Sequence, residues 1–486
     1  MKKTLLCFAL LVLVLPVKAQ DYENYKRQKL AEMERYKDSV KQNYDDYRRR
    51  ANEEYARYMR ENWEAFQVMK GEEKPILPEP PKPYEVDKDT PILNVPKPLP
   101  VKPIHTSDLT PLRPIKRPDA PQPSPVPSTP NFEFSCYGTP CVVSLDKNLK
   151  FNLKDVSETT CADAWKKLSS KKSEALLADC LELREELALG DWAYCCLLRD
   201  MTEAFLGKGT EEATFMQAYL IAQSGYKIRL GKLNERLIFL MPFDCVIFGR
   251  RYATIGGEKF YIFGTNEKGS MYVFNHAFSD SEQVMSLRMQ SLPKFRYQPT
   301  ENRQYTSACY PEMTVSVSTN KNLMDFYNDY PSCLWTNYCW AGLSDELKAQ
   351  LYPMLRKRIA GKSQIEAANR IINFVQTAFP YKSDQEQFGY ERSLFGDETF
   401  FYPYSDCEDR SILFSILIHD LLGLDVVLLS YPVHIATAVH YTEELNGSYF
   451  TFEGKTYFIS DPTYIGAKVG VCMPRLVNTS PEVYKL

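Results

Sequence analysis

The sequence is poor in the residues that build metal and membrane sites. It has five histidines in 486 residues and no Cys-x-x-Cys pair, so a zinc site is not expected. Beyond the N-terminus no stretch approaches the ~20 consecutive apolar residues of a transmembrane helix. Basic charge is not in excess either, because 59 Lys and Arg are interspersed with 62 Asp and Glu. Nucleic acid is therefore not expected as a partner.

The N-terminus has the pattern of a secretory signal peptide. Lys2 and Lys3 precede an apolar stretch over residues 5–16, and Val-Lys-Ala at 17–19 is a small-x-small cleavage site. We expect residues 1–19 to be removed after Ala19, leaving an exported protein that is periplasmic or secreted. No cysteine lies at the cleavage point, so a lipid anchor is not indicated.

Export would permit disulfides, but the spacing of the thirteen cysteines is not diagnostic. Each neighbouring pair is either a bridge or two buried free thiols. These pairs are Cys136 with Cys141, Cys195 with Cys196, and Cys333 with Cys339.

Residues 20–70 are highly charged, with aromatic residues and methionines recurring every eleven positions. Eleven residues make three helical turns at ~3.67 residues per turn, which predicts one long helix with an apolar stripe. So polar a helix is marginal by itself. The stripe packs on its own protein, frays in solution, or pairs with another helix, for example by self-association. Its two rows are Tyr22, Met33, Tyr44, Tyr55 and Phe66, and Tyr25, Tyr36, Tyr47, Tyr58 and Met69.

A proline-rich linker over residues 71–131 follows, holding eighteen of the 32 prolines. Proline fixes φ and removes an N–H donor, so we expect an extended, polyproline-like spacer. At ~3.1 Å per residue it could hold the helix ~100 Å or more from the rest of the chain.

The remainder is rich in aromatic and β-branched residues and mixes helices with short strands, which predicts an α+β fold in two domains, 132–300 and 301–486. Helices are expected at 160–188, 190–206, 211–224, 343–359, 363–379 and 406–422. Strands are expected at 226–231, 236–241, 259–264, 271–275, 314–318, 425–431, 434–441, 449–452 and 456–460.

Residues 405–411, Ser-Asp-Cys-Glu-Asp-Arg-Ser, open a long apolar run. Ser405 and Glu408 have the spacing of a capping box, which places Cys407 in the first turn of a helix over 406–422. Unpaired N–H groups and the helix dipole favour a thiolate there. The alternative is an inert, buried cysteine. The charged neighbours of Cys407 argue against burial, so we expect an exposed nucleophile.

His434 opens a strand, and Asp461 ends the strand over 456–460. If the two strands are antiparallel neighbours, His434 and Asp461 meet at one end of the sheet. A thiol attacks a carbonyl as thiolate, so Cys407 needs an imidazole base and a carboxylate to orient it. Both residues also have ordinary interpretations: a structural strand histidine, and an Asp-Pro turn.

Taken together, these motifs resemble bacterial transglutaminase-like domains of the papain-like cysteine protease superfamily. The resemblance covers about residues 340–486 and implies a papain-like fold with no cofactor and no metal ion. It implies Cys407 as nucleophile, His434 as base and Asp461 as the orienter of the base. The matching motifs are Cys-Glu-Asp-Arg-Ser at 407–411, Leu-Gly-Leu at 422–424, the strand-opening histidine and Asp-Pro-Thr at 461–463.

A weak internal similarity links the two predicted domains. Residues 201–205 and 375–379 each precede a helix, a strand pair and a hairpin. Matching these units places Gly209, Arg236 and Gly264 opposite the three residues of the expected triad. The first domain is therefore predicted to be a degenerate transglutaminase-like copy. Chance similarity between helix–strand–hairpin units is the alternative.

The combined prediction is an exported thiol enzyme that cleaves or transfers amide bonds of a protein or peptide substrate. Hydrolysis is favoured over crosslinking, because water is abundant and no amine site is evident. The chain has Ser405 and Ala436 where the family commonly has glycine and tryptophan, so substrate and acyl acceptor are not implied. The alternative is a non-catalytic scaffold that binds a protein partner through the helix over 20–70.

Overall fold

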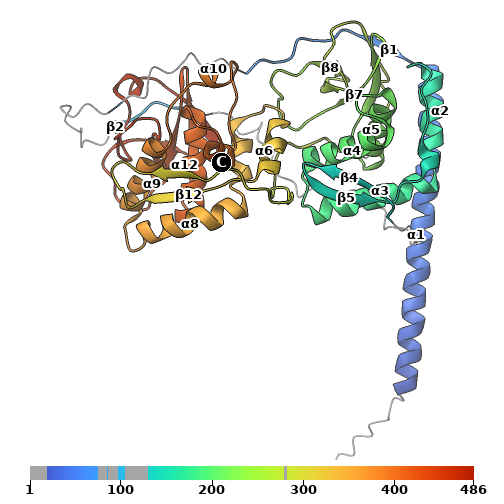
Figure 1. The fold of residues 1–486 in the computed structure, drawn as a ribbon, viewed down its shortest axis with the longest axis horizontal. Coiled ribbons are helices and arrows are strands. Elements are labelled where there is room, and N and C mark those ends of the chain that lie inside the picture. The colour runs from blue at the N-terminus through green and yellow to red at the C-terminus, as the bar shows by residue number, and fades with distance from the viewer. Residues whose placement is uncertain (1–18, 75–84, 86–96, 104–129, 279–281) are drawn as a thin grey trace, which may run out of the picture.

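The computed structural model describes residues 19–74, 85, 97–103, 130–278 and 282–486. The expected signal peptide and most of the expected linker thus lie outside the described residues. Figure 1 shows two lobes side by side and a long helix that projects from the first lobe. Both lobes mix helices and sheet, in agreement with the α+β prediction. None of the described helices combines the length and apolar composition that a bilayer crossing requires.

The first lobe packs four helices against a sheet and a separate hairpin. The helix expected over 160–188 is two helices, because the chain breaks at Ser169 and Ser170 and starts again from a serine N-cap. The elements are β4 (Phe132–Cys136), β5 (Thr139–Val143), α2 (Glu158–Leu168), α3 (Lys171–Glu186), α4 (Asp191–Leu206), α5 (Glu211–Gln223), β6 (Arg229–Leu233), β7 (Arg236–Met241), β8 (Tyr252–Ile255), β9 (Glu258–Phe263) and β10 (Met271–Val273).

The second lobe surrounds one buried helix, α12, with other helices on one side and a sheet on the other. Its elements are β11 (Arg303–Thr306), β12 (Thr314–Val317), α6 (Lys321–Asn328), α7 (Trp335–Ala341), α8 (Asp345–Ile359), α9 (Gln364–Ala378), α10 (Asp384–Gln387), α11 (Gly396–Phe401), α12 (Cys407–Leu422), β13 (Val426–Tyr431), β14 (His434–Val439), β15 (Ser448–Phe452), β16 (Lys455–Ile459) and β17 (Glu482–Lys485).

The two main sheets have the same strand order. One contains β10-β6-β7-β9-β8 and the other β17-β13-β14-β16-β15, with every one of these neighbours antiparallel. The registers also correspond. Leu240 pairs with Ile262 in the first sheet, and Ala438 pairs with Ile459 in the second. Counting from these pairs, Arg236 matches the first residue of β14, as the internal similarity predicted.

A segment that precedes both lobes closes both sheets; we call its described residues, 62–74, 85 and 97–103, the strap. In the first lobe β1 (Glu64–Phe66) pairs with β10 at one edge, and Met69 bridges β8 at the other. In the second lobe β2 (Lys97–Pro98) pairs with β15 and β3 (Lys102–Pro103) pairs with β17, again at opposite edges. Because a few residues reach from edge to edge, each sheet curls into a nearly closed barrel.

The described part of the linker is extended, as expected, but it docks on the lobes and does not act as a spacer. Its residues run along the second lobe and satisfy backbone groups at both sheet edges, where unpaired N–H and C=O groups attract an extra strand. Proline composition predicted the extended conformation but gave no sign of the edges to which it docks.

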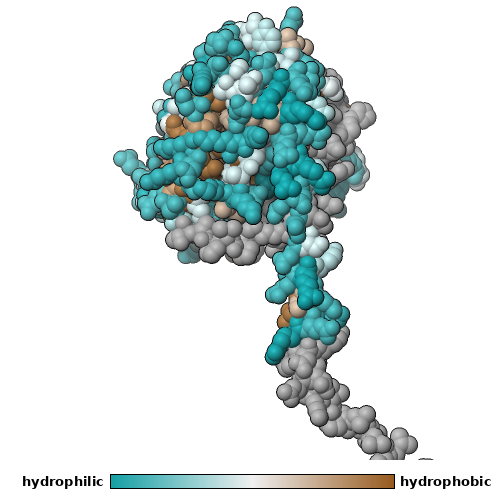
Figure 2. Space-filling view, turned by 90° about the vertical axis from the view of Figure 1, so that its right-hand side faces the viewer, coloured by the Kyte–Doolittle hydropathy of each residue, from teal (hydrophilic) through white to brown (hydrophobic). Residues whose placement is uncertain are grey.

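The long N-terminal helix is present as α1 (Ala19–Glu61), and it ends earlier than the predicted residue 70. At its C-terminal end Tyr55 is buried and lies 4.6 Å from the Trp165 ring, between centroids. Nearer the N-terminus the stripe is exposed: Met33 is 52% and Tyr36 72% exposed. Figure 2 shows a small apolar spot on the otherwise hydrophilic projecting part. Among the stripe residues whose side chains are described, the stripe thus packs on its own protein at the C-terminal end.

All twelve described cysteines are free, and ten of them are buried. The three pairs left open by the sequence are therefore buried thiols in this structure.

Candidate functional site

Cys407 is the first residue of α12, as its sequence context predicted. The predicted Ser405–Glu408 capping box is wrong by one residue. Asp406 is the N-cap, and its backbone N–H donates to the carboxylate of Asp409 at 3.2 Å. Several acidic and hydroxyl residues compete for this cap, and spacing alone does not choose between them. The positive end of the helix dipole still lies at the Cys407 thiol.

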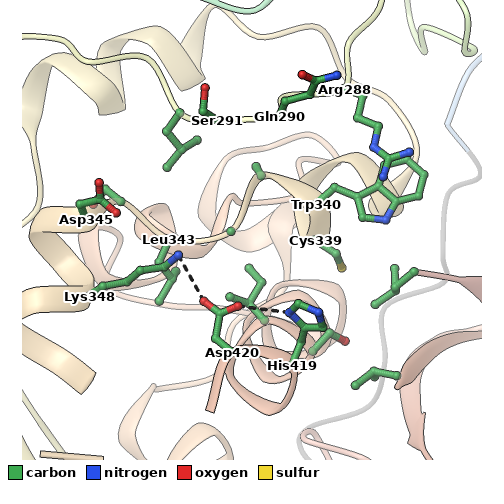
Figure 3. Close-up of a pocket in the computed structure, with 18 of the residues that line it drawn as sticks. Arg288, Gln290, Ser291, Cys339, Trp340, Leu343, Asp345, Lys348, His419 and Asp420 are labelled. Carbon is green, nitrogen blue, oxygen red and sulfur yellow. Dashed lines mark hydrogen bonds and ion pairs between the residues drawn. The ribbon is translucent and has the colours of Figure 1, made fainter. Parts of the chain in front are cut away.

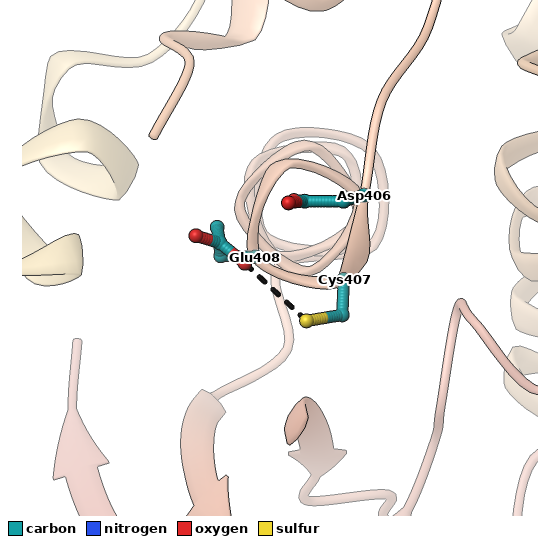
Figure 4. Close-up of side chains that lie close together, drawn as sticks. All are labelled: Asp406, Cys407 and Glu408. Carbon is teal, nitrogen blue, oxygen red and sulfur yellow. Dashed lines mark hydrogen bonds between the residues drawn. The ribbon is translucent and has the colours of Figure 1, made fainter. Parts of the chain in front are cut away.

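The expectation that Cys407 is exposed is also wrong, because its side chain is only 1% accessible. Figure 4 shows the sulfur turned toward Glu408, whose Oε2 accepts its S–H at 3.3 Å. Burial, and then the charges of Glu408 and Asp406, raise the pKa of Cys407 well above its usual value, although the backbone N–H of Ile435 opposes this. Charged neighbours indicated a surface, but here they are buried with the thiol. In this conformation Cys407 is a thiol.

His434 and Asp461 form the pair that the sequence predicted. Strands β14 and β16 are antiparallel, so the start of one meets the end of the other. His434 Nε2 lies 2.8 Å from Asp461 Oδ2, and both side chains are buried. The other oxygen of Asp461 accepts the backbone N–H of Thr463 at 2.9 Å. A carboxylate only accepts, so in the neutral imidazole Nε2 carries the proton and Nδ1 a lone pair.

The three expected catalytic residues converge on one end of β14, but only two are bonded to each other. The N–H of Ile435, the residue after His434, donates to the Cys407 sulfur. Among the described residues no hydrogen bond joins Cys407 to His434, and buried His434 Nδ1 has no partner. The lone pair of Nδ1 is thus unoccupied, while the thiol of Cys407 donates to Glu408. Long thiol–imidazole contacts are common before a substrate binds.

The strap supplies a residue that sequence reasoning missed. Lys74 is buried at the start of α12, 3.6 Å from both Glu408 and Glu391, and it donates to the hydroxyl of Ser393. Its ammonium lies 5.7 Å from the centroid of the Trp335 ring. More than 300 residues separate Lys74 from Glu391, Ser393 and Glu408 in the chain. Nothing in the sequence distinguishes it from the other lysines of a proline-rich segment.

Gln376 is a second missed residue, and it fixes the turn that carries Asp461. Its side-chain amide, on α9, donates to the carbonyls of Asp461, Tyr464 and Ala467 at 2.8–3.1 Å. Its Oε1 accepts the N–H of Gly466 at 3.2 Å. One buried amide therefore ties the whole turn to α9. The helical pattern of α9 marks Gln376 as facing the core but does not reveal this role.

The matching positions of the first lobe hold no such chemistry. Arg236 donates to the carbonyl of Gly209 at 3.2 Å and pairs with Glu211 at 2.8 Å. A Cβ on Gly264 would lie 2.9 Å from the carbonyl oxygen of Leu237, so that position is also too tight for an aspartate. Glycine, arginine and glycine thus lie at the positions that match Cys407, His434 and Asp461.

A cavity of about 960 Å³ lies between the lobes, at the other end of α12 (Figure 3). His419 and Asp420 line it, together with Arg288, which stacks on Trp340 at 3.9 Å. Twelve helical residues, ~18 Å at 1.5 Å per residue, separate His419 from Cys407. The cavity therefore does not belong to the cysteine site.

Comparisons of the chain with protein-family models, with curated proteins and with solved structures find no match. The chemistry open to the site therefore follows from its geometry. Acyl transfer through a thioester requires a thiol, an imidazole base and a carboxylate that orients the base, and residues of these three types lie around the start of β14.

Proposed function

We propose that the chain is a thiol enzyme that acts on amide bonds of a protein or peptide, with Cys407 as nucleophile, His434 as base and Asp461 as its orienter. The observation that carries the proposal is the buried His434–Asp461 hydrogen bond of 2.8 Å, which leaves Nδ1 unpartnered at the end of β14 that faces Cys407. A buried ring nitrogen without a hydrogen-bond partner costs free energy, and such groups are common at functional sites.

The mechanism begins when the thiol leaves Glu408 and gives its proton to Nδ1 of His434. The thiolate attacks the amide carbonyl carbon, and the imidazolium then protonates the leaving amine as the C–N bond breaks. This leaves an acyl-thioester on Cys407. Water, deprotonated by His434, attacks the thioester and releases the acid and the thiol. Hydrolysis remains favoured over transfer to an amine.

Labelling of Cys407 by iodoacetamide and by a peptide substrate analogue with an electrophilic carbonyl, mapped by mass spectrometry, tests this assignment. Cys309 is exposed and serves as the reference thiol in the same protein. We expect a peptide substrate analogue with an electrophilic carbonyl to modify Cys407 faster than Cys309, and His434→Ala to abolish that preference. If His434→Ala leaves the ratio unchanged in a folded protein, His434 is not the base.

A non-catalytic scaffold is the second candidate, and one observation favours it. Cys407 is buried and bonded to Glu408, and burial with neighbouring charges raises its pKa. A thiol locked in this state would not react with any electrophilic peptide. The alkylation experiment separates the two candidates, because the scaffold predicts that Cys407 reacts more slowly than Cys309 with every reagent.

Three further parts of the proposal concern the whole chain. The export pattern over residues 1–19 supports a periplasmic or secreted enzyme. The shared strand order and register support a first lobe that is a degenerate, catalytically empty copy of the second. The exposed stripe of α1 supports self-association through the predicted segment 20–70. The contact would use the N-terminal part of this segment, because Tyr55 is buried in the first lobe.

A further inference from the structure

Carboxylates outnumber cations at the start of α12. Five acidic side chains lie within reach of one another there; we call them the acidic cluster. Four of them are almost completely buried, and the fifth, Glu391, is partly buried. The folded protein can bury so many carboxyl groups only if cations or protons neutralise them. The cluster consists of Asp384, Glu391, Asp406, Glu408 and Asp409.

The cations near the acidic cluster do not balance it. Lys74 pairs with Glu391 and Glu408, the two glutamates of the cluster. Arg410 is buried close by, but its guanidinium donates to the Ser405 hydroxyl and to two main-chain carbonyls. Among the described ion pairs none reaches Asp384, Asp406 or Asp409. The aspartate side of the cluster therefore has no cation in ion-pair contact, and Lys74 and Arg410 act on it only from a longer distance.

Two oxygens on that side also lack any hydrogen bond. Asp384 Oδ1 and Asp406 Oδ1 are buried without a partner, and their side chains are 2% and 4% exposed. Asp384, Asp406 and Asp409 each offer one oxygen within 4.8 Å of the others. A buried, unpaired carboxylate oxygen loses its hydration without a replacement.

We propose that Asp384, Asp406 and Asp409 form a binding site for a hard divalent cation, with calcium as the best fit. Calcium bonds to oxygen at 2.3–2.6 Å, so two of its ligands lie at most ~5 Å apart, as these oxygens do. Magnesium requires ~2.0–2.1 Å and a stricter octahedron. Asp384 also faces Glu391 and Glu408 within the same 4.8 Å limit, so further oxygens are close.

Backbone hydrogen bonds hold these carboxylates in place. Asp384 Oδ2 accepts the N–H of Arg392 at 2.5 Å, and Asp409 Oδ1 accepts the N–H of Leu394 at 2.8 Å. Asp409 Oδ2 accepts the N–H of Asp406 at 3.2 Å. Since the second shell is already formed, the ion would meet a preorganised site.

Calcium titration of the chelator-stripped full chain, by isothermal calorimetry and thermal unfolding, tests the proposal. We expect one ion per chain and a saturable rise in Tm. Asp384→Asn should weaken binding at least ~10-fold. Glu235→Gln, which removes a carboxylate 86% exposed in the first lobe, should leave it unchanged. Cys407→Ser should also bind, so a failure of the proposed catalysis would not affect this result.

Terbium luminescence provides a second measurement if Asp384→Asn does not fold. Terbium bound to the wild-type chain should be displaced by calcium. Asp406→Asn should bind terbium more weakly than the wild type. Absence of heat, Tm shift and terbium binding at millimolar calcium would overturn the proposal and mean that protons alone neutralise the acidic cluster. An equal response from Asp384→Asn and wild type, or binding of zinc but not calcium, would overturn it too.

Discussion

At the residue scale, Glu408 connects the thiol to the strap. Its Oε2 accepts from Cys407 at 3.3 Å, while Oε1 lies 3.6 Å from the Lys74 ammonium. Burial disfavours the charge of Glu408, but Lys74 and hydrogen bonds from Glu391 and Asp406 outweigh it and lower its pKa to about 2. One buried carboxylate thus keeps the thiol protonated and is itself held ionised by a lysine from outside the lobe.

Replacement of Gln376 should weaken the second lobe. Gln376→Leu keeps the volume but leaves the N–H of Gly466 and the carbonyl of Ala467 without their partners. We expect a loss of about 2–4 kcal/mol in the free energy of unfolding, measured with urea. Gln304→Leu changes an exposed glutamine on β11 and should cost less than about 0.5 kcal/mol. Equal losses would contradict the role given to Gln376.

Asp397 should make stability fall with rising pH. Burial raises its pKa to about 6, against hydrogen bonds from Ser344. The folded pKa exceeds the unfolded one, so the native state holds the proton more tightly and loses stability as pH rises from ~4 to ~6, by roughly 3 kcal/mol. Asp397→Asn should reduce the decline in urea unfolding curves by that amount, while Glu398, whose pKa burial raises to about 7, keeps its own share. Asp345→Asn, which changes an exposed aspartate of α8, should retain it.

At the scale of elements, the strap supplies two edge strands that the sequence of the second lobe does not contain. Its barrel closes only because β2 and β3 add to β15 and β17. Leu99 lies between these strands and packs into the barrel interior with Leu429 and Phe450. The N–H of Leu99 also donates to the carbonyl of Tyr449 at 2.6 Å. The second lobe is thus complete only with residues from before the first lobe.

Removal of the Lys74 charge should loosen the strap. Lys74→Met leaves Glu408 buried without its cation, a change that typically costs about 3–5 kcal/mol. We expect lower stability and faster alkylation of Cys407 relative to Cys309. Lys70→Met is the matched control, because Lys70 precedes it by four residues and is 84% exposed in its pair with Glu73. If both variants behave alike, Lys74 does not anchor the strap.

At the scale of the whole molecule, α1 combines an anchored end with a projecting one. Tyr55 and Met59 are buried in the first lobe, whereas Leu30, Met33 and Tyr36 are 49–72% exposed. The projecting part is visible in Figure 1 as the blue helix below the lobe. A polar helix without packing is marginal, so we expect its apolar stripe to pair with a second copy of the chain.

Sedimentation equilibrium of the full chain checks this expectation. We expect association that increases with protein concentration, and Tyr36→Lys should shift the chain toward monomer by placing a charge in the stripe. Tyr390→Lys, at another exposed tyrosine, should not. A wild-type chain that stays monomeric at every concentration would contradict self-association through α1.

The sequence by itself determined the parts that depend on near neighbours. The 11-residue repeat gave the long helix, the apolar run gave the buried α12 with Cys407 at its start, and strand patterns placed His434 and Asp461 at adjoining ends. Local periodicity and capping act over a few residues, so they can be inferred from the chain alone.

Tertiary structure decided what lies around those residues. Lys74 reaches Glu408 across more than 300 positions, the strap closes both barrels, and the charged neighbours of Cys407 are buried with it. Burial and the pKa of the thiol depend on which distant segments fill the remaining space, and composition does not encode that. The sequence thus proposed Cys407 as a nucleophile with His434 and Asp461 as its partners, and the fold determined that the Cys407 thiol is protonated, covered and bonded to a carboxylate.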